Sequence, residues 1–392
     1  GDMNRVSANA PVHRAGPSMA GPAEVEQPAS PLLASHGTDP SPLKPVIFST
    51  DLVEPRSRLG LWQSKYESFN TIVPAGKPGP SFSGRNVIWS FGALALSRNT
   101  APGVSIERST RQIRRDSIDH WVLRVARTGA SRYRSASACF VTSPGLLALF
   151  SLGEPSESDR TNADWLSLYI PRDAFPDLSM GLAALGAGVL ETPGAALLAD
   201  YLLLLERRLS AMTPEQVPVL ATATRSMIAA CLLAGIAPGT VSPADKATAR
   251  MERIRHVIRQ NIGRATLDPQ RICSLAGVSR SNLYRLFEPH GGVAHYIQGQ
   301  RLRMAHAMLS EPGCRASVAE IGERLGFFDA SAFSRVFRRE FGYTPGEARA
   351  AGQQGLRATG VETTCSTSCG LDFGGLLRRL AAGDRREALP PA

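Results

Sequence analysis

The chain has 392 residues, 43% of them hydrophobic, and its 44 Lys and Arg against 34 Asp and Glu give a formal charge of +10. This length exceeds what one hydrophobic core organises, so we expect two domains with tails, and the basic balance favours polyanionic partners. A membrane span is excluded because charges interrupt the strongest apolar run, 197–209, and no disulfide framework, metal site or cofactor is expected because the six cysteines form no C-x-x-C pair or Cys/His cluster.

The first 45 residues are rich in Pro, Ala and Ser and almost without aromatic side chains. Such a composition cannot bury enough apolar surface to fold, so we expect 1–45 to be disordered. It also contains no apolar segment of signal-peptide type, which makes the cytoplasm the expected compartment.

Residues 46–176 contain short segments of alternating or β-rich character, punctuated by Gly, Pro, Ser and Asn. The clearest ones are 86–96, 119–127, 137–142, 146–152 and 164–170. This pattern is typical of a small antiparallel sandwich or barrel.

Residues 177–234 are predicted to be helical, with two long helices at 195–211 and 214–234. The first helix carries a wide leucine stripe and therefore needs a partner surface. Two partners fit it equally well, namely the chain's own β domain and the same helix of a second subunit in a homodimer. The Pro and Gly content of 235–249 predicts a linker.

The charge is concentrated after this linker. Between 245 and 350 there are 17 basic and 10 acidic residues, so +7 of the formal +10 lies in about a quarter of the chain. We expect the Gly- and Arg-rich tail, 351–392, to be mostly disordered. Its Cys365 and Cys369 have a C-x3-C spacing, which in a flexible tail is usually neither a metal site nor a redox pair.

Capping residues divide the basic domain into two helix–turn–helix units. In the first unit a helix begins after Asp268 and stops at Gly277, and Ser279 caps a second helix. In the second unit Ser317 begins a capping box, and Asp329 caps the helix that follows. The two units are therefore expected to have the same local structure.

The second helices of the two units also repeat in sequence, at an offset of 50 residues. The paired positions are Ser281 with Ser331, Leu283 with Phe333, Arg285 with Arg335, Leu286 with Val336 and Phe287 with Phe337. At about 100° per residue the apolar members share one face and the Ser and Arg members lie opposite. The apolar face is predicted to be core, and the polar face to be displayed.

The displayed face is predicted to contact double-stranded DNA. A charged helix face is usually only solvated, but recurrence of the same face in a duplicated unit favours DNA. Such a helix fits the major groove, where arginine bonds guanine O6 and N7 and serine reaches base or phosphate. We therefore predict base or phosphate contacts for Arg285 and Arg335.

At this point residues 250–350 resemble the AraC/XylS family of bacterial transcription regulators. In the second unit and after it, the resemblance is carried by Ile321, Gly326, Phe327, Asp329, Ser331, Phe333, Ser334, Arg335, Phe337, Phe341, Gly342, Pro345 and Arg349. In the first unit and the helix between the units, it is carried by Val278, Ser279, Leu283, Arg285, Phe287, Gly292, Tyr296, Arg301, Leu302, Ala305 and Leu309. Two departures from the family pattern, Gly322 and Ala348, are expected to loosen packing.

The resemblance implies a transcription activator that inserts two helix–turn–helix units into successive major grooves, with RNA polymerase as a further partner. It places the base-facing positions at Arg280, Ser281, Asn282, Tyr284 and Arg285 in the first reader, and at Ala330, Ser331, Ser334, Arg335 and Arg338 in the second. Ala330 offers only a methyl group, so the second reader is expected to be modestly selective.

The N-terminal region is similar to the cupin-like sensor domain of a branch of this family, through 119–129 and 165–175. The resulting fold class is α+β, with a cupin-like β-barrel at 46–176 and an all-α domain at 250–350. This similarity implies a small-molecule effector pocket or a dimerisation surface. The candidate effector-binding residues are Trp62, Trp89, Trp121, Arg124 and Phe140. Because Trp121 and Arg124 have unlike parity on one strand, at most one of them points inward.

Other interpretations of the N-terminal domain stay open. The aromatic residues fit a barrel core as well as a pocket, so the barrel could be a dimerisation module of a constitutive regulator or repressor. A cupin-type enzyme needs several His and Glu ligands, and His120 is the sole histidine between 46 and 176. A DNA-repair methyl acceptor would need a cysteine cluster. We therefore expect no catalytic residue, and no basic amphipathic anchor supports a membrane-surface role.

Overall fold

The computed structural model describes residues 43–76, 82–116, 118–234, 243–264, 267–288, 291–310, 314–341, 343–350 and 373–377. The predictions for residues 1–42 and 235–242, and those for Cys365 and Cys369, fall outside these ranges. Among the described residues, no helix is both long and apolar enough to cross a membrane.

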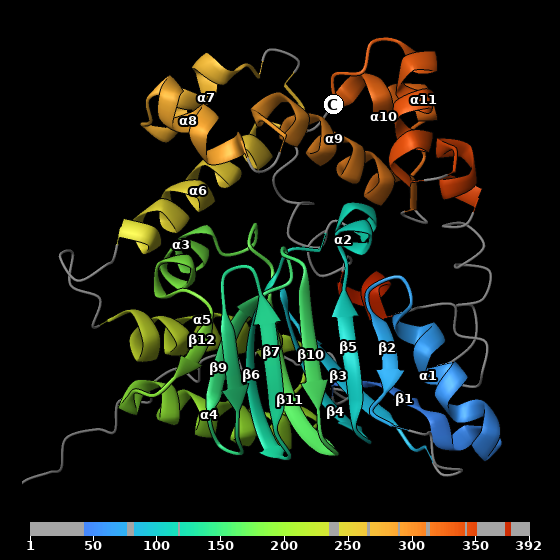
Figure 1. The fold of residues 1–392 in the computed structure, drawn as a ribbon, viewed down its shortest axis with the longest axis vertical. Helices are drawn as coiled ribbons and strands as arrows, with labels where there is room; N and C mark the ends of the chain where they lie inside the picture. The colour runs from blue at the N-terminus through green and yellow to red at the C-terminus, as the bar shows by residue number, and fades with distance from the viewer. Residues whose placement is uncertain are drawn as a thin grey trace, which may run out of the picture. The chain divides into compact units, whose positions relative to one another are not determined.

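Within the part of the chain that the structure describes, the N-terminal domain is built on two antiparallel sheets (Figure 1). The seven-stranded sheet has the order β1 (Val46–Ser49), β3 (Arg85–Phe91), β4 (Leu94–Ala101), β11 (Ala163–Ile170), β6 (Trp121–Thr128), β9 (Leu147–Ser151) and β12 (Gly188–Leu190). The five-stranded sheet has the order β2 (Thr71–Pro74), β5 (Val104–Arg108), β10 (Ser156–Arg160), β7 (Ser131–Ser135) and β8 (Cys139–Thr142). The predicted sandwich or barrel is confirmed.

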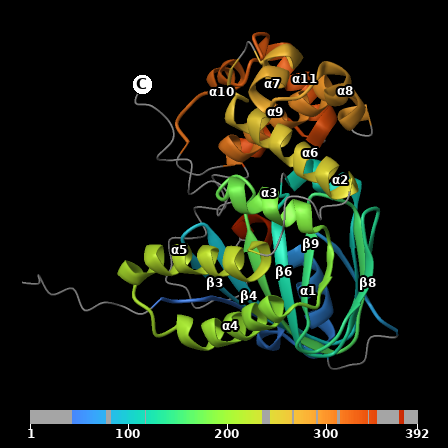
Figure 2. The same ribbon diagram turned by 90° about the vertical axis from the view of Figure 1, so that its left-hand side faces the viewer.

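Both faces of the seven-stranded sheet are buried. Side chains alternate along its strands, so in β6 Leu123 enters one hydrophobic cluster and Val122 enters another. The second cluster lies between the sheets, and the first lies under α3 (Pro176–Leu185), α4 (Pro193–Leu209) and α5 (Val217–Ile228). Figure 2 shows α4 and α5 against this outer face. Burial on both sides explains why five of the six residues at 121–126 are apolar.

The leucine stripe of α4 packs mainly against the chain's own sheet. Leu198, Leu202 and Leu205 are buried in the outer cluster. Leu197 and Leu204 are 57% and 49% exposed, respectively, on the helix side away from it. The leucine stripe is therefore wide because one part of it packs against the sheet and another part is exposed on the surface.

One predicted β segment is in fact a hairpin. Residues 86–96 divide into β3 and β4, and Gly92, with a φ of 59°, occupies the turn between them. The sequence pattern also missed the helices α1 (Arg58–Tyr66) and α2 (Thr110–Asp116), as well as the short helical turns at Thr50–Leu52 and Pro55–Ser57. The helix predicted at 214–234 begins with a short helical turn, Pro214–Gln216, that leads into α5. A π-helical turn, Ala229–Leu233, follows α5.

The C-terminal domain consists of α6 (Pro243–Gln260), α7 (Pro269–Ala276), α8 (Arg280–Phe287), α9 (Val293–Ser310), α10 (Val318–Arg324) and α11 (Ala330–Phe341). One hydrophobic cluster joins residues of all six helices. Helix α6 begins at Pro243, so the second half of the predicted linker, 243–249, is helical instead. A starting Pro at the first helical turn suits this boundary.

A short piece of the predicted tail is part of the β domain. Residues 373–377 form a helical turn, and Phe373 and Leu377 are buried in the cluster between the sheets. The Phe373 ring lies 5.3 Å from Tyr66 and 5.6 Å from Phe69, measured between centroids. Composition alone hid this contact because the apolar residues here are few and flanked by Gly and Arg.

Substitution of Phe373 tests whether the tail completes the β domain. Loss of a buried Phe side chain costs about 3 kcal/mol, which lowers the melting temperature of a domain of this size on the order of 6 to 12 °C. We expect Phe373→Ala to give such a decrease in thermal unfolding, whereas Val219→Ala, at a position that is 73% exposed, should change it little. Equal melting temperatures for Phe373→Ala and the unmodified chain would contradict this placement.

Candidate functional site

In the first helix–turn–helix unit, side-chain caps fix where both helices begin. Asp268 accepts a hydrogen bond from the Arg271 N–H at 2.8 Å, and Gly277, with a φ of 65°, ends α7 in the left-handed conformation. Ser279 then accepts from the Asn282 N–H at 3.3 Å and starts α8. The turn between the helices is thus short and defined at each end.

The second unit uses the same devices. Ser317 and Glu320 form a reciprocal capping box at the start of α10. The Asp329 carboxylate accepts hydrogen bonds from the N–H groups of Ala332 at 3.0 Å and Ser331 at 2.8 Å, and these bonds lower its pKa. The predicted starts of both second helices are confirmed by these contacts.

Helix α11 has a fully buried face and a displayed one. Phe333, Phe337 and Phe341 have no exposed surface. The predicted DNA-contact residues lie on other sides of the helix, with Ala330, Ser331, Arg335 and Arg338 exposed and Ser334 half-buried. The phenylalanines therefore anchor the helix and leave the arginine side chains free to meet a ligand.

The two departures from the family pattern lie in this packing. A Cβ atom at Gly322 would come within 3.2 Å of the Phe333 ring, so the glycine gives the ring room. Ala348 is buried in the same cluster. Gly322 therefore accommodates the anchor of the second reader, contrary to the expectation that it loosens packing.

Helix α8 repeats the arrangement. Leu283 and Phe287 are fully buried. Among the predicted contact residues, Arg280, Ser281, Tyr284 and Arg285 are exposed and Asn282 is half-buried. Arg285 Nη2 donates to Asn282 Oδ1 at 2.9 Å, which holds the guanidinium along the helix surface.

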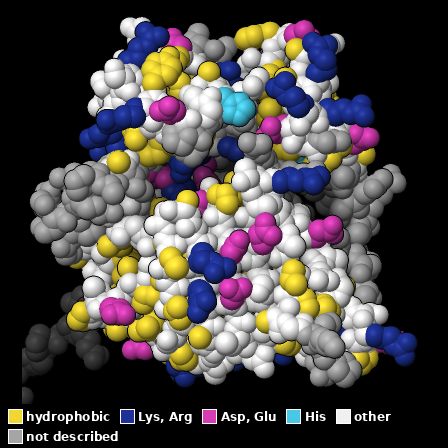
Figure 3. Space-filling view, in the orientation of Figure 1, with side chains coloured by type: hydrophobic (Ala, Val, Ile, Leu, Met, Phe, Trp, Pro, Cys, Tyr) yellow, Lys and Arg dark blue, Asp and Glu magenta, His cyan; other side chains and the backbone are white. Residues whose placement is uncertain are grey.

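Helix α9 connects the two units through one core (Figure 1). Its Ile297, Leu302 and Leu309 are buried in that core. Its Arg301 donates to the carbonyl oxygens of Ile262 and Arg264 at 3.2 and 2.9 Å, respectively. The two readers are therefore held by the same rigid body, and Figure 3 shows Lys and Arg side chains gathering over this helical domain more densely than over the sheets.

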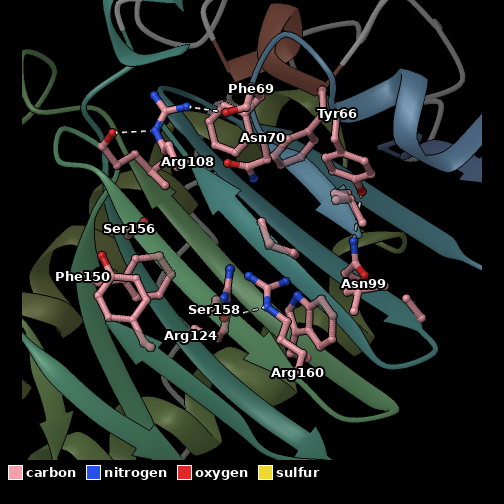
Figure 4. A pocket seen from close by; sticks show the side chains of 18 of the residues that line it. Tyr66, Phe69, Asn70, Asn99, Arg108, Arg124, Phe150, Ser156, Ser158 and Arg160 are labelled. Atoms are coloured by element: carbon pink, nitrogen blue, oxygen red, sulfur yellow. Dashed lines mark hydrogen bonds between the residues drawn. The ribbon is translucent and has the colours of Figure 1, made fainter. Parts of the chain in front are cut away.

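A cavity lies between the two sheets of the β domain (Figure 4). It has an empty volume of about 690 Å³, with the solvent at its opening included. Its lining combines aromatic and aliphatic side chains with Arg108, Arg124 and Arg160. The lining also includes Phe373 from the C-terminal segment.

The predicted effector residues are divided by the structure. Trp62 and Arg124 line the cavity. Trp89 and Trp121 belong to the cluster on the other face of the sheet, as the parity of Trp121 and Arg124 required. Phe140 stacks on Tyr133 at 4.9 Å between centroids and stands behind the lining.

Sequence reasoning missed the lining residues Arg108 and Arg160. Both lie in strands that face solvent on one side, so their segments are polar and were not recognised as β structure. Arg108 is satisfied by the protein itself, because its guanidinium donates to the carbonyl oxygens of Phe69, Ile118 and Leu152 at 2.7 to 2.9 Å.

Residues 272–351 match a family model described as a helix-turn-helix domain. The transcriptional activator NphR of Rhodococcus sp is 26% identical over 263 residues, which cover 65% of this chain and 77% of that protein. The XylDLEGF operon transcriptional activator 1 of Pseudomonas putida is 33% identical over 106 residues, and the match spans 26% of this chain and 32% of that protein. Residues 272–351 therefore form a helix-turn-helix domain similar to that of these transcriptional activators.

The crystal structure of the AraC-like transcriptional activator CuxR is also similar. It has 28% sequence identity and a TM-score of 0.48, and the similarity covers 72% of this chain and 100% of that one. These relatives are transcription regulators rather than enzymes. The prediction of a helix–turn–helix domain of the kind found in transcription regulators is therefore confirmed.

An ion-pair cluster joins the β domain to α6 of the C-terminal domain. Arg172, which follows β11, pairs with Glu252 of α6, and both side chains are buried. Arg259 of α6 pairs with Asp173, with Asp119 at 2.8 Å and with Glu252 at 3.1 Å. Removing one partner of a buried pair leaves an uncompensated charge, so this contact is stable only while every member is ionised.

Two carboxylates of the cluster, Asp119 and Glu252, are held in the ionised form. Burial acts to raise the pKa of Asp119, but the charges of Arg259 and Arg172 outweigh it and lower the pKa from 3.8 to about 2. The pKa of Glu252 is lowered in the same way, against the effect of its burial. The Arg172 guanidinium is further supported by the Trp121 ring, 4.1 Å from its Cζ.

The lowered pKa of Asp119 predicts how stability depends on pH. A carboxylate with a depressed pKa stabilises the folded state above its unfolded pKa and loses this contribution as pH falls through its folded pKa. The melting temperature of the chain should therefore exceed that of Asp119→Asn by a constant amount above about pH 4, and the gap should narrow toward pH 2. Thermal unfolding at a series of pH values measures this gap.

The control for this measurement is Asp177→Asn, because the Asp177 side chain is 82% exposed. The difference in melting temperature between this variant and the unmodified chain should be small at every pH. A gap for Asp119→Asn that stays unchanged between pH 5 and pH 2.5 would contradict the ionised contact.

Proposed function

We propose that this chain is a transcription activator of the bacterial cytoplasm that reads two successive major grooves with α8 and α11. The observation that carries the proposal is the repeated Ser/Arg face, exposed on both helices, with both helices anchored in one core. Helix–turn–helix proteins place the second helix of each unit in the major groove, with successive grooves about one helical turn apart. Activation implies RNA polymerase as a further partner.

The β domain is proposed to control this activity by binding a small-molecule effector. Its cavity supports this role, since ligand sites are concave, mostly apolar and equipped with a few polar groups. A β domain that only dimerises would have no need for charged side chains around an internal cavity. The cavity therefore favours the effector role over the dimerisation role.

Arg335 provides the test of DNA reading. Sites are first selected from random duplexes with the unmodified chain, and affinity is then measured at fixed salt. We expect Arg335→Ala to lose about 1 to 3 kcal/mol at one base position and to relax selectivity there. Selection repeated with the variant should return the same site with that position degenerate.

Two control variants distinguish the loss of base contacts from the loss of positive charge. Arg335→Lys keeps the charge but loses the planar fork that bonds a guanine edge, so it should also relax selectivity while keeping the salt dependence. Arg134→Ala removes an exposed arginine of the β domain and should bind as the unmodified chain does. Unchanged affinity and preference for Arg335→Ala would refute the assignment of the second reader.

A homodimer through α4 is part of the same proposal. Leu197 and Leu204 are spaced seven residues apart, on one side of the helix, and both are largely exposed. We expect sedimentation equilibrium to give a dimer for the unmodified chain and a monomer for the double variant Leu197→Glu, Leu204→Glu. Val141→Glu, at an exposed position of the other sheet, should stay dimeric. A double variant of unchanged mass would exclude α4 as the interface.

A further inference from the structure

Two arginine side chains enter the cavity from opposite sheets (Figure 4). Arg124 lies on β6 of the seven-stranded sheet, and Arg160 lies on β10 of the five-stranded sheet. Each binds a serine hydroxyl through Nε, Arg124 to Ser167 at 2.9 Å and Arg160 to Ser158 at 3.1 Å. Among the described residues, no carboxylate forms an ion pair with either guanidinium.

Arg124 and Arg160 are half-buried, and their situation differs from that of the arginines buried elsewhere in the chain. Arg108 is surrounded by three carbonyl oxygens, and Arg172 and Arg259 face carboxylates. Buried charges in proteins are normally paired, because the loss of hydration is costly without a compensating partner. Burial lowers the pKa of Arg124, and for Arg160 burial and the nearby charge of Arg124 act together in the same direction.

Among the described residues that line the cavity, none is an aspartate or a glutamate. Burial raises the pKa of two of its tyrosines, Tyr66 and Tyr133, which therefore stay neutral. Aromatic rings hold the guanidinium groups in place instead. The Arg160 Cζ lies 4.5 Å from the Trp165 ring centroid, and the Arg124 Cζ lies 4.7 Å from that of Phe150. The two cations are thus ordered before any ligand binds.

The rest of the lining indicates the shape and polarity of a ligand that would fit the cavity. Trp62, Phe69 and Phe150 offer ring surfaces, and Ile72 and Val104 offer aliphatic ones. These surfaces suit a flat apolar group and leave inorganic anions poorly accommodated. A buried acceptor, Asn99 Oδ1, also has no hydrogen-bond partner in the structure and lines the same cavity. An unpaired buried acceptor is costly, so it favours a ligand that also carries a donor.

We propose that this cavity binds a small organic carboxylate with a flat apolar body, whose carboxylate bridges Arg124 and Arg160 across the two sheets. A hydroxyl or amino group on the ligand body would donate to Asn99 Oδ1. This inference rests on the proposed effector role of the β domain and specifies the chemical class of its effector. Pairing with one carboxylate supplies the negative charge that both guanidinium groups lack.

The test uses the full chain without DNA and four probes: cinnamate, 4-hydroxycinnamate, the neutral isostere cinnamamide, and inorganic phosphate. Thermal shift and calorimetric titration measure binding. We expect both carboxylates to raise the melting temperature, and 4-hydroxycinnamate, which brings a donor, to bind at least as tightly as cinnamate. Cinnamamide and phosphate should bind at least tenfold more weakly. Equal binding of cinnamamide, or no shift with either carboxylate, would overturn the proposal.

Variants of the two arginines provide a second test, because they should weaken ligand binding without lowering the ligand-free melting temperature. Arg124→Met and Arg160→Met should each weaken carboxylate binding at least tenfold, while the ligand-free melting temperature stays the same or rises because an unpaired, half-buried charge is removed. An arginine with a purely structural role would give a lower ligand-free melting temperature and unchanged binding, which would contradict the proposal. Arg132→Met, an exposed position of the neighbouring strand β7, is the matched control and should change neither quantity.

The result of these ligand-binding measurements does not depend on whether α8 and α11 bind DNA. Carboxylate binding without DNA recognition would refute the proposed readers and leave the cavity assignment intact. DNA recognition without carboxylate binding would refute the cavity assignment alone.

Discussion

Burial of the seven-stranded sheet on both faces is the constraint on which the other features of the β domain depend. Because side chains alternate along a strand, each strand must serve two environments at once. In β6 the outward residues Trp121 and Leu123 meet the helices, and the inward residue Arg124 meets the cavity. The helices α3 to α5 are needed on one side, and the second sheet on the other. A cavity between the sheets is what remains where large polar side chains occupy inward positions.

The alternation of side chains along a strand also limits how much of the fold could be predicted from the sequence. Helix caps, the 50-residue repeat and the buried phenylalanines of α11 were all predictable, because they depend on residues close in the chain. Strands such as β6 and β11 were predictable from their runs of apolar residues. Strand β10, "SESDR", was not, since its outward side chains face solvent and its inward ones, Ser158 and Arg160, are polar cavity residues.

Contacts between distant segments were beyond sequence reasoning for a different reason. Trp121 was a plausible pocket residue by type, yet its face of β6 is set by the pairing of β6 with β11 and β9. Phe373 lies in a Gly-rich context, and only its neighbours Tyr66 and Tyr169 reveal why it is there. The ion pair of Arg172 with Glu252 joins positions 80 residues apart that no local pattern connects.

The cavity and the DNA-binding domain are linked by a short series of contacts. Arg124 and Trp121 lie on opposite faces of β6, three residues apart, and Trp121 supports the Arg172 guanidinium that pairs with Glu252 of α6. Helix α6 shares its core with both readers. A ligand can change the behaviour of the readers only through a difference in its affinity for two arrangements of this path. A buried ion-pair cluster suits such a path, because its contacts are either all made or costly to lose, which gives two discrete arrangements rather than a gradual change.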